Sequence, residues 1–264
     1  PYEDILGDDE TMGWQSIVSW GDQSALLCLD AVSSAGTSRV ELLELGIEGD
    51  AIVAQAPRDA TEALGFLFAG DDAWLEVNMI AHGQRLFFAA LDADFQVHFQ
   101  LYDPTTGEVS EKGTTPLAQY LSIASVEDGV LVVGPDDEDE ELMNLSLLKL
   151  SDGTMRTLRG VAVDSAQQVG NVAYDASTEL LYYTLNNIVY AVQLTGDDAP
   201  QAVGRLAEIP DASRFGALVG SLYVCRDQEG ELQSCAVDEE LDLTQLVVAL
   251  FHIDRSVGPL PCKE

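Results

Sequence analysis

The segments LFFAALDA (residues 86–93) and FQVHFQLYD (residues 95–103) decide the fold class. The first is an almost continuous apolar run, which is typical of a β-strand whose two faces are both covered. The second alternates apolar and polar residues with a period of two, as a strand does when its faces meet different surroundings. A short polar loop separates them. The pair therefore predicts two neighbouring strands of one sheet.

The same order of strands and turns recurs five times along the chain. Each unit has a strand of small residues, a polar turn, an apolar strand, a polar loop, an alternating strand and a turn rich in Gly or Asp. The apolar strands are ALLCLDA (25–31), LFFAALDA (86–93), VLVVGPD (130–136), LLYYTLNN (180–187) and SLYVCRD (221–227). The closing turns lie at Gly49, Gly107, Gly153, Gly196 and near Asp238, at intervals of 58, 46, 43 and 42 residues. The first interval is longer because residues 58–72 look inserted.

Repeats of about 40–50 residues with three or four strands each are typical of β-propeller blades. We therefore predict an all-β protein: one propeller domain, 1–264, of five or six blades, each an antiparallel sheet of three to four strands around a central channel. A β-sandwich or two small β-domains would not explain why one strand order recurs. The predicted units are about 14–57, 74–113, 119–160, 168–209 and 213–250.

Two regions qualify this prediction. The apolar tail 243–261 could be a fourth strand of the last blade, part of a sixth blade, or the strand that closes the ring. Helical periodicity occurs only in residues 59–68 and 239–250, and the second of these favours a strand because Val247 and Val248 are β-branched.

One turn carries a resemblance to known proteins. LYDPTTGEV (101–109) is similar to the D-x-x-T-G-x-v turn of quinoprotein-type and related bacterial propeller repeats, with looser copies at 147–158 and 189–198. The resemblance implies a propeller fold only. Together with the absence of catalytic motifs and the acidic, lysine-poor composition, it leads us to expect an exported bacterial module, as part of a larger lipoprotein or surface protein. The tryptophan docking motif of the quinoprotein repeats is missing, so it implies no cofactor of that kind.

The charge of the chain restricts its partners. Twelve Lys and Arg residues against 46 Asp and Glu residues give a net charge of −34, which repels phosphate backbones. We therefore expect neither nucleic acid nor an anionic membrane as a partner. Three interpretations remain open: an acidic scaffold of a high-salt organism, an exported protein that meets calcium or cationic partners, or solubility alone. No apolar run reaches the 18 residues of a transmembrane helix.

The cysteines bear on the compartment. Cys225 and Cys235 lie symmetrically about the turn in CRDQEGELQSC, so a hairpin centred near Gly230 would place them opposite each other, where a disulfide is geometrically possible. Cys28 and Cys262 could form a second bridge. The alternative is that all four are reduced. Oxidised pairs favour an extracellular or cell-surface location, which we predict.

No catalytic or metal-binding signature stands out. His82, His98 and His252 are isolated, and we expect His98 to face solvent, whereas His82 closes an innermost strand and could line the channel. The acidic run DDEDEE (136–141) could supply calcium ligands but lacks the spacing of an EF-hand loop, so a solvated loop is expected. Nucleophile elbows, P-loops and dinucleotide-binding glycine motifs are missing. We predict no catalytic residues and no resident cofactor.

The predicted binding surface is one face of the propeller. Loops that enter the innermost strands, and loops that join second to third strands, emerge together over the channel mouth. The candidate ligand- or partner-binding residues are Trp14, Trp74, Tyr120, Asn171, Arg214 and His82. Aromatic residues in loops anchor sugars, peptides or proteins well, although each could instead pack within the fold.

The sequence thus favours a non-enzymatic exported binding or protein-interaction module for a protein or carbohydrate ligand. The alternatives are a propeller-type glycan hydrolase or lyase with carboxylates at the channel mouth, and the acidic scaffold of a high-salt organism. Oligomeric state has no signature in the sequence.

Overall fold

The computed structural model describes residues 6–7, 9–20, 24–48, 51–67, 76–166, 169–175, 179–185, 188–205, 216–219, 222–226 and 232–236. Within these residues, all but three short helical elements and the connecting loops are β-strand, and the strands form five antiparallel sheets. The all-β prediction is therefore confirmed.

Each sheet is a meander, in which strands adjacent in sequence pair with one another. The first sheet contains β1 (Glu10–Ser19), β2 (Ser24–Ser33), β3 (Ser38–Glu48), β4 (Ala51–Ala54) and β5 (Arg58–Asp59). The second contains β6 (Glu76–His82), β7 (Arg85–Leu91), β8 (Gln96–Asp103) and β9 (Glu108–Pro116). The third contains β10 (Ser122–Val126), β11 (Gly129–Pro135), β12 (Leu142–Leu148) and β13 (Met155–Ala162). The fourth contains β14 (Val169–Asp175), β15 (Leu180–Leu185), β16 (Ile188–Gln193) and β17 (Gln201–Arg205), and the fifth β18 (Gly216–Val219), β19 (Leu222–Arg226) and β20 (Leu232–Ala236).

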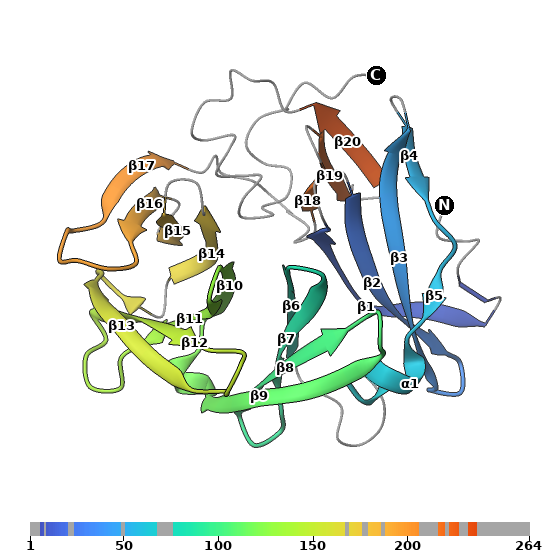
Figure 1. Cartoon of the computed structure of the whole chain (residues 1–264), viewed down its shortest axis with the longest axis horizontal. Coiled ribbons are helices and arrows are strands. Elements are labelled where there is room, and N and C mark those ends of the chain that lie inside the picture. The colour runs from blue at the N-terminus through green and yellow to red at the C-terminus, as the bar shows by residue number, and fades with distance from the viewer. Residues whose placement is uncertain are drawn as a thin grey trace.

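The sheets are arranged as the blades of a propeller (Figure 1). The first strand of each sheet lies innermost, and the sheets follow one another around a common centre. Strand β1 packs against β6, β6 against β10, and β10 against β14, while β18 returns to pack against β1 and β2. The chain is thus a β-propeller protein, and its fifth sheet lies beside its first. The tail 243–261, which bears on a sixth blade and on ring closure, lies outside the described residues.

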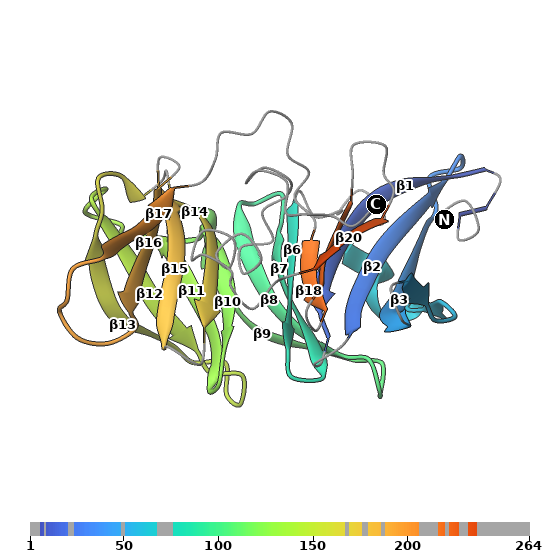
Figure 2. The same cartoon turned by 90° about the horizontal axis from the view of Figure 1, so that it is seen from above.

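The connections define two faces, between which the strands run (Figure 2). In a meander, the loop that enters a first strand and the loop that joins the second to the third strand lie at the same end of the sheet. We call this end the loop face; among the described residues it carries the segments 34–37, 92–95, 117–121 and 136–141.

The core lies between the blades, which explains why the second strands are apolar throughout. On β7, Phe88 packs into the cluster between the first and second sheets, and Phe87 into the cluster between the second and third; both rings are fully buried. On β11, Val132 faces the second sheet and Val133 the fourth. Because each second strand serves two cores, both of its alternating faces must be apolar.

The insertion predicted in the first unit closes the rim of the first sheet. Strands β4 and β5 pair with different parts of β3 and so are two pieces of one outer strand. They are followed by α1 (Thr61–Leu64) and the 3-10 turn η2 (Gly65–Leu67), where the sequence shows helical periodicity. Leu64 and Leu67 are fully buried in the cluster between the first two sheets. The other segment with such periodicity, 239–250, lies outside the described residues. Across the described chain, no helix is both long and apolar enough to span a membrane.

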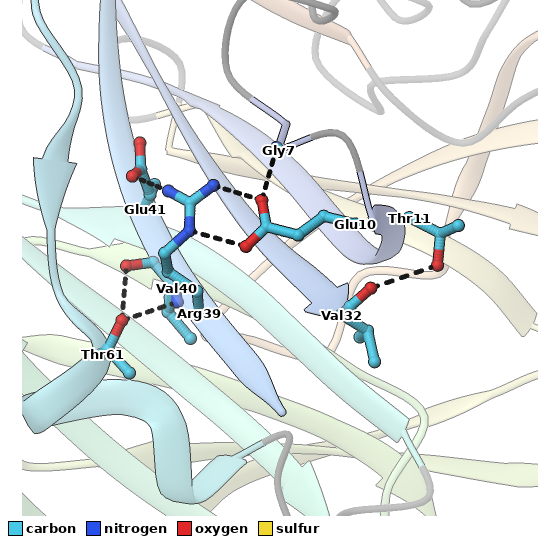
Figure 3. Close-up of polar contacts among 8 residues, drawn as sticks. All are labelled: Gly7, Glu10, Thr11, Val32, Arg39, Val40, Glu41 and Thr61. Carbon is cyan, nitrogen blue, oxygen red and sulfur yellow. Dashed lines mark hydrogen bonds and ion pairs between the residues drawn. The ribbon is translucent and has the colours of Figure 1, made fainter. Parts of the chain in front are cut away.

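An ion-pair cluster fastens the loop-face end of the first sheet (Figure 3). The Arg39 guanidinium on β3 reaches past β2 to Glu10 on β1, with Nη2–Oε2 and Nε–Oε1 distances of 2.6 and 3.0 Å, and it also contacts Glu41. The backbone N–H of Gly7 donates to Glu10 at 2.7 Å. Arg39, followed by the Gly7 amide, lowers the pKa of Glu10 to about 2. The innermost strand β1 is thereby tied to the third strand of its sheet.

Candidate functional site

A polar pocket lies between the second and third sheets, next to the loop face. Its volume is about 240 Å³. One wall is made by the end of β9 and the 3-10 turn η3 (Leu117–Gln119), and the other by strands β11 to β13 with the loop that follows β11. The lining residues are Thr115, Gln119, Val132, Gly134, Pro135, Asp136, Asp137, Asn144, Ser146, Met155 and Thr157.

The register of the third sheet brings these side chains to one face. Val132 is paired with Ser146, and Ser146 in turn with Thr157, so one row across three strands points toward the second sheet. Gly134 and Asn144 form the next row toward the loop face. Near the centre of the propeller this face is apolar, because Val132 belongs to the core between the blades. Toward the rim it becomes polar, and this change creates the pocket.

Gly134 allows η3 to lie directly against β11. A Cβ atom at position 134 would lie 1.8 Å from the carbonyl oxygen of Gln119, a distance that real Cβ contacts essentially never show. The backbone N–H of Leu121 also donates to the carbonyl of Val133 at 2.8 Å. The glycine therefore fixes Gln119 above the pocket, on a segment anchored by the third sheet.

Two aspartates at the loop-face end hold the amide side chains of the pocket. The Gln119 amide donates to Asp137, and the Asn144 Nδ2 donates to Asp136 Oδ2 at 2.9 Å. The backbone N–H of Glu138 donates to Asp136 Oδ1, also at 2.9 Å. That backbone hydrogen bond, followed by the one from Asn144, lowers the pKa of Asp136. Asp136 is therefore ionised near neutral pH, and this end of the pocket is negatively charged.

The hydroxyl groups of the lining residues complete the polar wall. Ser146 Oγ and Thr157 Oγ1 lie 3.2 Å apart, and the Thr115 hydroxyl donates to Gln119 Oε1 at 3.3 Å. The pocket can thus bind a ligand through oxygen atoms of several kinds.

The two predicted aromatic anchors that the structure describes pack between blades. Tyr120 has an exposed fraction of 8%, accepts a hydrogen bond from Asn78 Nδ2 at 3.2 Å, and lies 6.3 Å from the Phe99 ring. Tyr120 is thus packed between blades, and its role as a partner-binding residue stays a prediction. Trp14 is half-buried in β1 and donates its indole N–H to the Val77 carbonyl at 3.2 Å, which ties the first sheet to the second.

His82 belongs to the opposite end of the propeller. It ends β6, far from the loop face, and its Nδ1 lies 3.0 Å from Ser125 Oγ on β10. Burial, with a smaller contribution from Arg85, lowers the pKa of His82 and keeps its ring neutral near neutral pH. This histidine links two innermost strands and lies apart from the pocket.

The remaining predicted residues are described only in part. Asn171 lies on β14, but its side chain is outside the described part of the chain, as are Trp74, Arg214 and His252. His98 is half-buried, with its Nε2 atom 2.9 Å from Asp92 Oδ2 and its Nδ1 atom 3.4 Å from Glu111 Oε1. It is therefore paired with carboxylates rather than simply solvated.

The cysteine register differs from the one the sequence suggested. The β19–β20 pairing places Cys225 opposite Gln233 and Cys235 opposite Tyr223, so the two cysteines are diagonal neighbours on one face of the hairpin. Their side chains lie outside the described residues, and the disulfide stays a prediction. Cys28 is a free and fully buried thiol, so it does not form the bridge to Cys262 that the sequence left open.

The acidic run 136–141 is the loop between β11 and β12, as expected. Two aspartates shape it: Asp136 accepts from the backbone N–H of Glu138, and Asp139 from that of Glu141, each at 2.9 Å. Among the described residues, no group of three or more His, Cys, Asp or Glu side chains is arranged to hold a metal ion.

The sequence did not single out the residues of this pocket, apart from the acidic run. Gln119, Asn144, Ser146 and Thr157 lie on three different elements. Strand pairing in the third sheet brings the last three together, and the packing of η3 against β11 adds Gln119. A weak signal existed in NLSLLKL (144–150), where Asn144 and Ser146 are polar at alternate positions of an otherwise apolar strand. Such alternation marks a face that is not part of a core.

Comparisons with known proteins found similarity among solved structures. No protein family and no curated protein matches it. Among solved structures it is similar to AofleA from Arthrobotrys oligospora, with 10% identity and a TM-score of 0.49 over 87% of this chain and 70% of that one. It is also similar to the SapL1 lectin in complex with alpha methyl fucoside (12%, 0.44, covering 87% and 76%) and to an oligogalacturonate lyase in complex with manganese (13%, 0.45, covering 86% and 70%). Similarities this distant carry no argument about function.

Proposed function

We propose that this chain is a non-enzymatic binding module that takes a partner or ligand through its loop face, at the pocket between the second and third sheets. The observation that carries the proposal is the pocket itself: a cavity of about 240 Å³ whose polar walls are held by contacts between two blades. Preorganised polar groups around a concave surface are what a specific ligand site requires.

The carboxylates of the pocket bear on the hydrolase or lyase alternative. A glycoside hydrolase needs one carboxylic acid that stays protonated near neutral pH and a second carboxylate that is ionised. Asp136, whose hydrogen bonds lower its pKa, could act only as the ionised one. Because the sequence carries no catalytic motif beside it, we prefer the binding module to the hydrolase or lyase alternative.

The net charge of −34 indicates the kind of partner. A strongly acidic surface speeds the encounter with a basic partner and suppresses binding to acidic ones. An extracellular or cell-surface location, such as that of an exported bacterial lipoprotein, belongs to this proposal. It is tested by fractionation of the source cells with antibodies to the chain.

The proposal is tested with a variant that fills the pocket. Thr157 is an exposed residue of β13 that lines the pocket, so Thr157→Tyr should block the site without unfolding the protein. Thr114→Tyr on β9 is the matched control, because Thr114 is exposed but faces away from the pocket. Labelled wild type and both variants are applied to arrays of peptides and glycans.

We expect wild type and Thr114→Tyr to bind the same array members without turning them over, and Thr157→Tyr to lose them. Equal binding by Thr157→Tyr, conversion of a glycan to product, or no bound member at all would each overturn the proposal.

A further inference from the structure

We propose that the pocket between the second and third sheets recognises an alkylammonium group, that is, a protonated primary amine at the end of an aliphatic chain. The inference rests on the proposed binding function and names the ligand chemistry of the same site. It follows from the charge of the pocket, from the state of its hydrogen-bonding groups, and from where its apolar surface lies.

Charge excludes anionic ligands. The charged side chains that line the pocket are Asp136 and Asp137, and among the described lining residues none is basic. An anion would face two carboxylates with no cation to offset them, whereas a cation gains from both.

Acceptor oxygens are the most numerous hydrogen-bonding groups of the pocket. The amides of Gln119 and Asn144 each donate one N–H to Asp137 and Asp136, and the carboxylate oxygens keep further lone pairs for a ligand. Ser146 and Thr157 add two hydroxyl oxygens 3.2 Å apart. An ammonium group has three donors and no acceptor, so several of these oxygens can accept from it at once.

The same hydrogen bonds favour an ammonium over a guanidinium. A guanidinium binds best when both oxygens of one carboxylate are free to accept its parallel N–H pair. Asp136 Oδ2 accepts from Asn144 and Asp136 Oδ1 from the backbone of Glu138, so each oxygen of this carboxylate keeps only part of its acceptor capacity for a parallel N–H pair. A compact ammonium can share single lone pairs with several neighbours.

Apolar surface lies at the other end of the pocket. Met155 is 42% exposed and pairs with Leu148, four residues along β12 from Asn144. At about 3.3 Å per residue, Met155 lies roughly 13 Å along the strand from the acidic end. Val132 lines the wall between them. An aliphatic chain could lie on this surface with its ammonium at the aspartates, and the flexible Met155 side chain can adapt to it.

Two sources supply this chemistry: a lysine side chain on a partner protein, and a free aliphatic amine. The test therefore uses two probes, cadaverine and a short peptide with one lysine between glycines. Pentanediol serves as the neutral isostere of cadaverine. Binding is measured by calorimetry and by backbone amide NMR shifts at low ionic strength, on the whole chain.

The variants separate the pocket from the general acidity of its loop. Asp137→Asn removes a pocket charge, and Glu138→Gln removes a neighbouring charge that does not line the pocket. A second pair, Asp136→Asn and Asp139→Asn, is matched more closely, because each aspartate accepts one backbone N–H two residues ahead. Thermal unfolding of each variant confirms that it is folded.

We expect cadaverine or the lysine peptide to bind, with shifts at Asn144, Ser146 and Thr157, and pentanediol not to bind. Asp137→Asn should weaken binding about tenfold, as for the loss of one hydrogen bond to a charged group, and Glu138→Gln less than twofold. Binding of the peptide alone identifies a protein lysine as the source, and binding of both probes a free amine as well.

Equal effects of Asp137→Asn and Glu138→Gln, equal binding of pentanediol, or no binding of either probe would overturn the inference. The proposed function is tested separately. If the array ligands depend on Thr157 but neither probe competes with them, the pocket is a binding site for another chemistry, and only the alkylammonium inference fails.

Discussion

Replacement of Gly134 by alanine tests whether the packing of η3 on β11 builds the pocket. The added Cβ would lie 1.8 Å from the Gln119 carbonyl oxygen, 2.3 Å from its carbonyl carbon and 3.0 Å from the Tyr120 nitrogen. All three are backbone atoms, so no side chain can rotate to relieve the clash. The Gln119 oxygen must move from 1.8 Å to beyond 3.0 Å, which shifts η3 or β11 by more than an ångström.

Overpacking of this kind costs about 1–3 kcal/mol. For a domain of this size, each kcal/mol lowers the melting temperature by roughly 2–4 °C, so we expect Gly134→Ala to melt about 2–12 °C below wild type. Urea unfolding gives the free energy directly. Because Gln119 moves with η3, binding at the pocket should weaken in parallel with stability.

Gly46 on β3 provides the control. It is also a strand glycine, but a Cβ atom there would meet nothing within 4 Å. Alanine favours a strand over glycine, so we expect Gly46→Ala to be neutral or to stabilise by up to about 1 kcal/mol. If Gly134→Ala proves as stable as Gly46→Ala, the close approach of η3 to β11 does not exist and the geometry of the pocket is wrong.

Three further predictions concern other parts of the fold. Arg39 holds the pKa of Glu10 at about 2, below its usual 4.5. Their pairing therefore stabilises the fold above about pH 4.5, and this contribution is lost as pH falls toward 2. Glu10→Gln should lower the free energy of unfolding in urea by about 1–3 kcal/mol near pH 7 and by almost nothing near pH 2. Trp14→Phe removes the hydrogen bond that ties the first two sheets and should cost about 1–2 kcal/mol by the same assay, whereas an unchanged free energy would assign Trp14 no role in blade packing. If Cys225 and Cys235 form a disulfide, alkylation of the unfolded, unreduced protein followed by mass spectrometry will leave these two thiols unmodified, and modification of both would remove the support they give to an extracellular location.

The fold was predictable because every repeat of a propeller carries the same pattern of apolar and polar strands. Phe87 and Phe88 are adjacent on β7 and enter two different cores, so the strand must be apolar at every position. The same demand holds for the second strand of each blade, and five such runs at similar intervals leave few other folds. The turn near Gly107 fits the pattern for a local reason, since its φ of 74° is a backbone conformation that glycine adopts at little cost.

Tyr120 is more buried than its place in a loop led us to expect, for a reason that follows from the same architecture. Tyr120 stands just before the innermost strand β10, where the chain crosses from one blade to the next. A sequence places such a residue in a loop, and loops are usually exposed. Here the crossing itself is buried, because η3 packs on Gly134 and the tyrosine ring fills the space between Phe99 and Asn78.

The pocket could not be predicted because it belongs to the junction between two repeats. Thr115 and Thr157 line the same cavity although 42 residues, about one repeat, separate them in the sequence. Nothing in either repeat alone distinguishes these threonines from others on outer strands, since Thr114 beside Thr115 is equally polar but faces away from the pocket. The alternation that reveals a strand says which residues share a face, and only the docking of the next blade decides whether that face is core, solvent or binding site. The ligand site proposed here therefore depends on the contacts between two blades, where a single glycine, Gly134, sets the distance between η3 and β11.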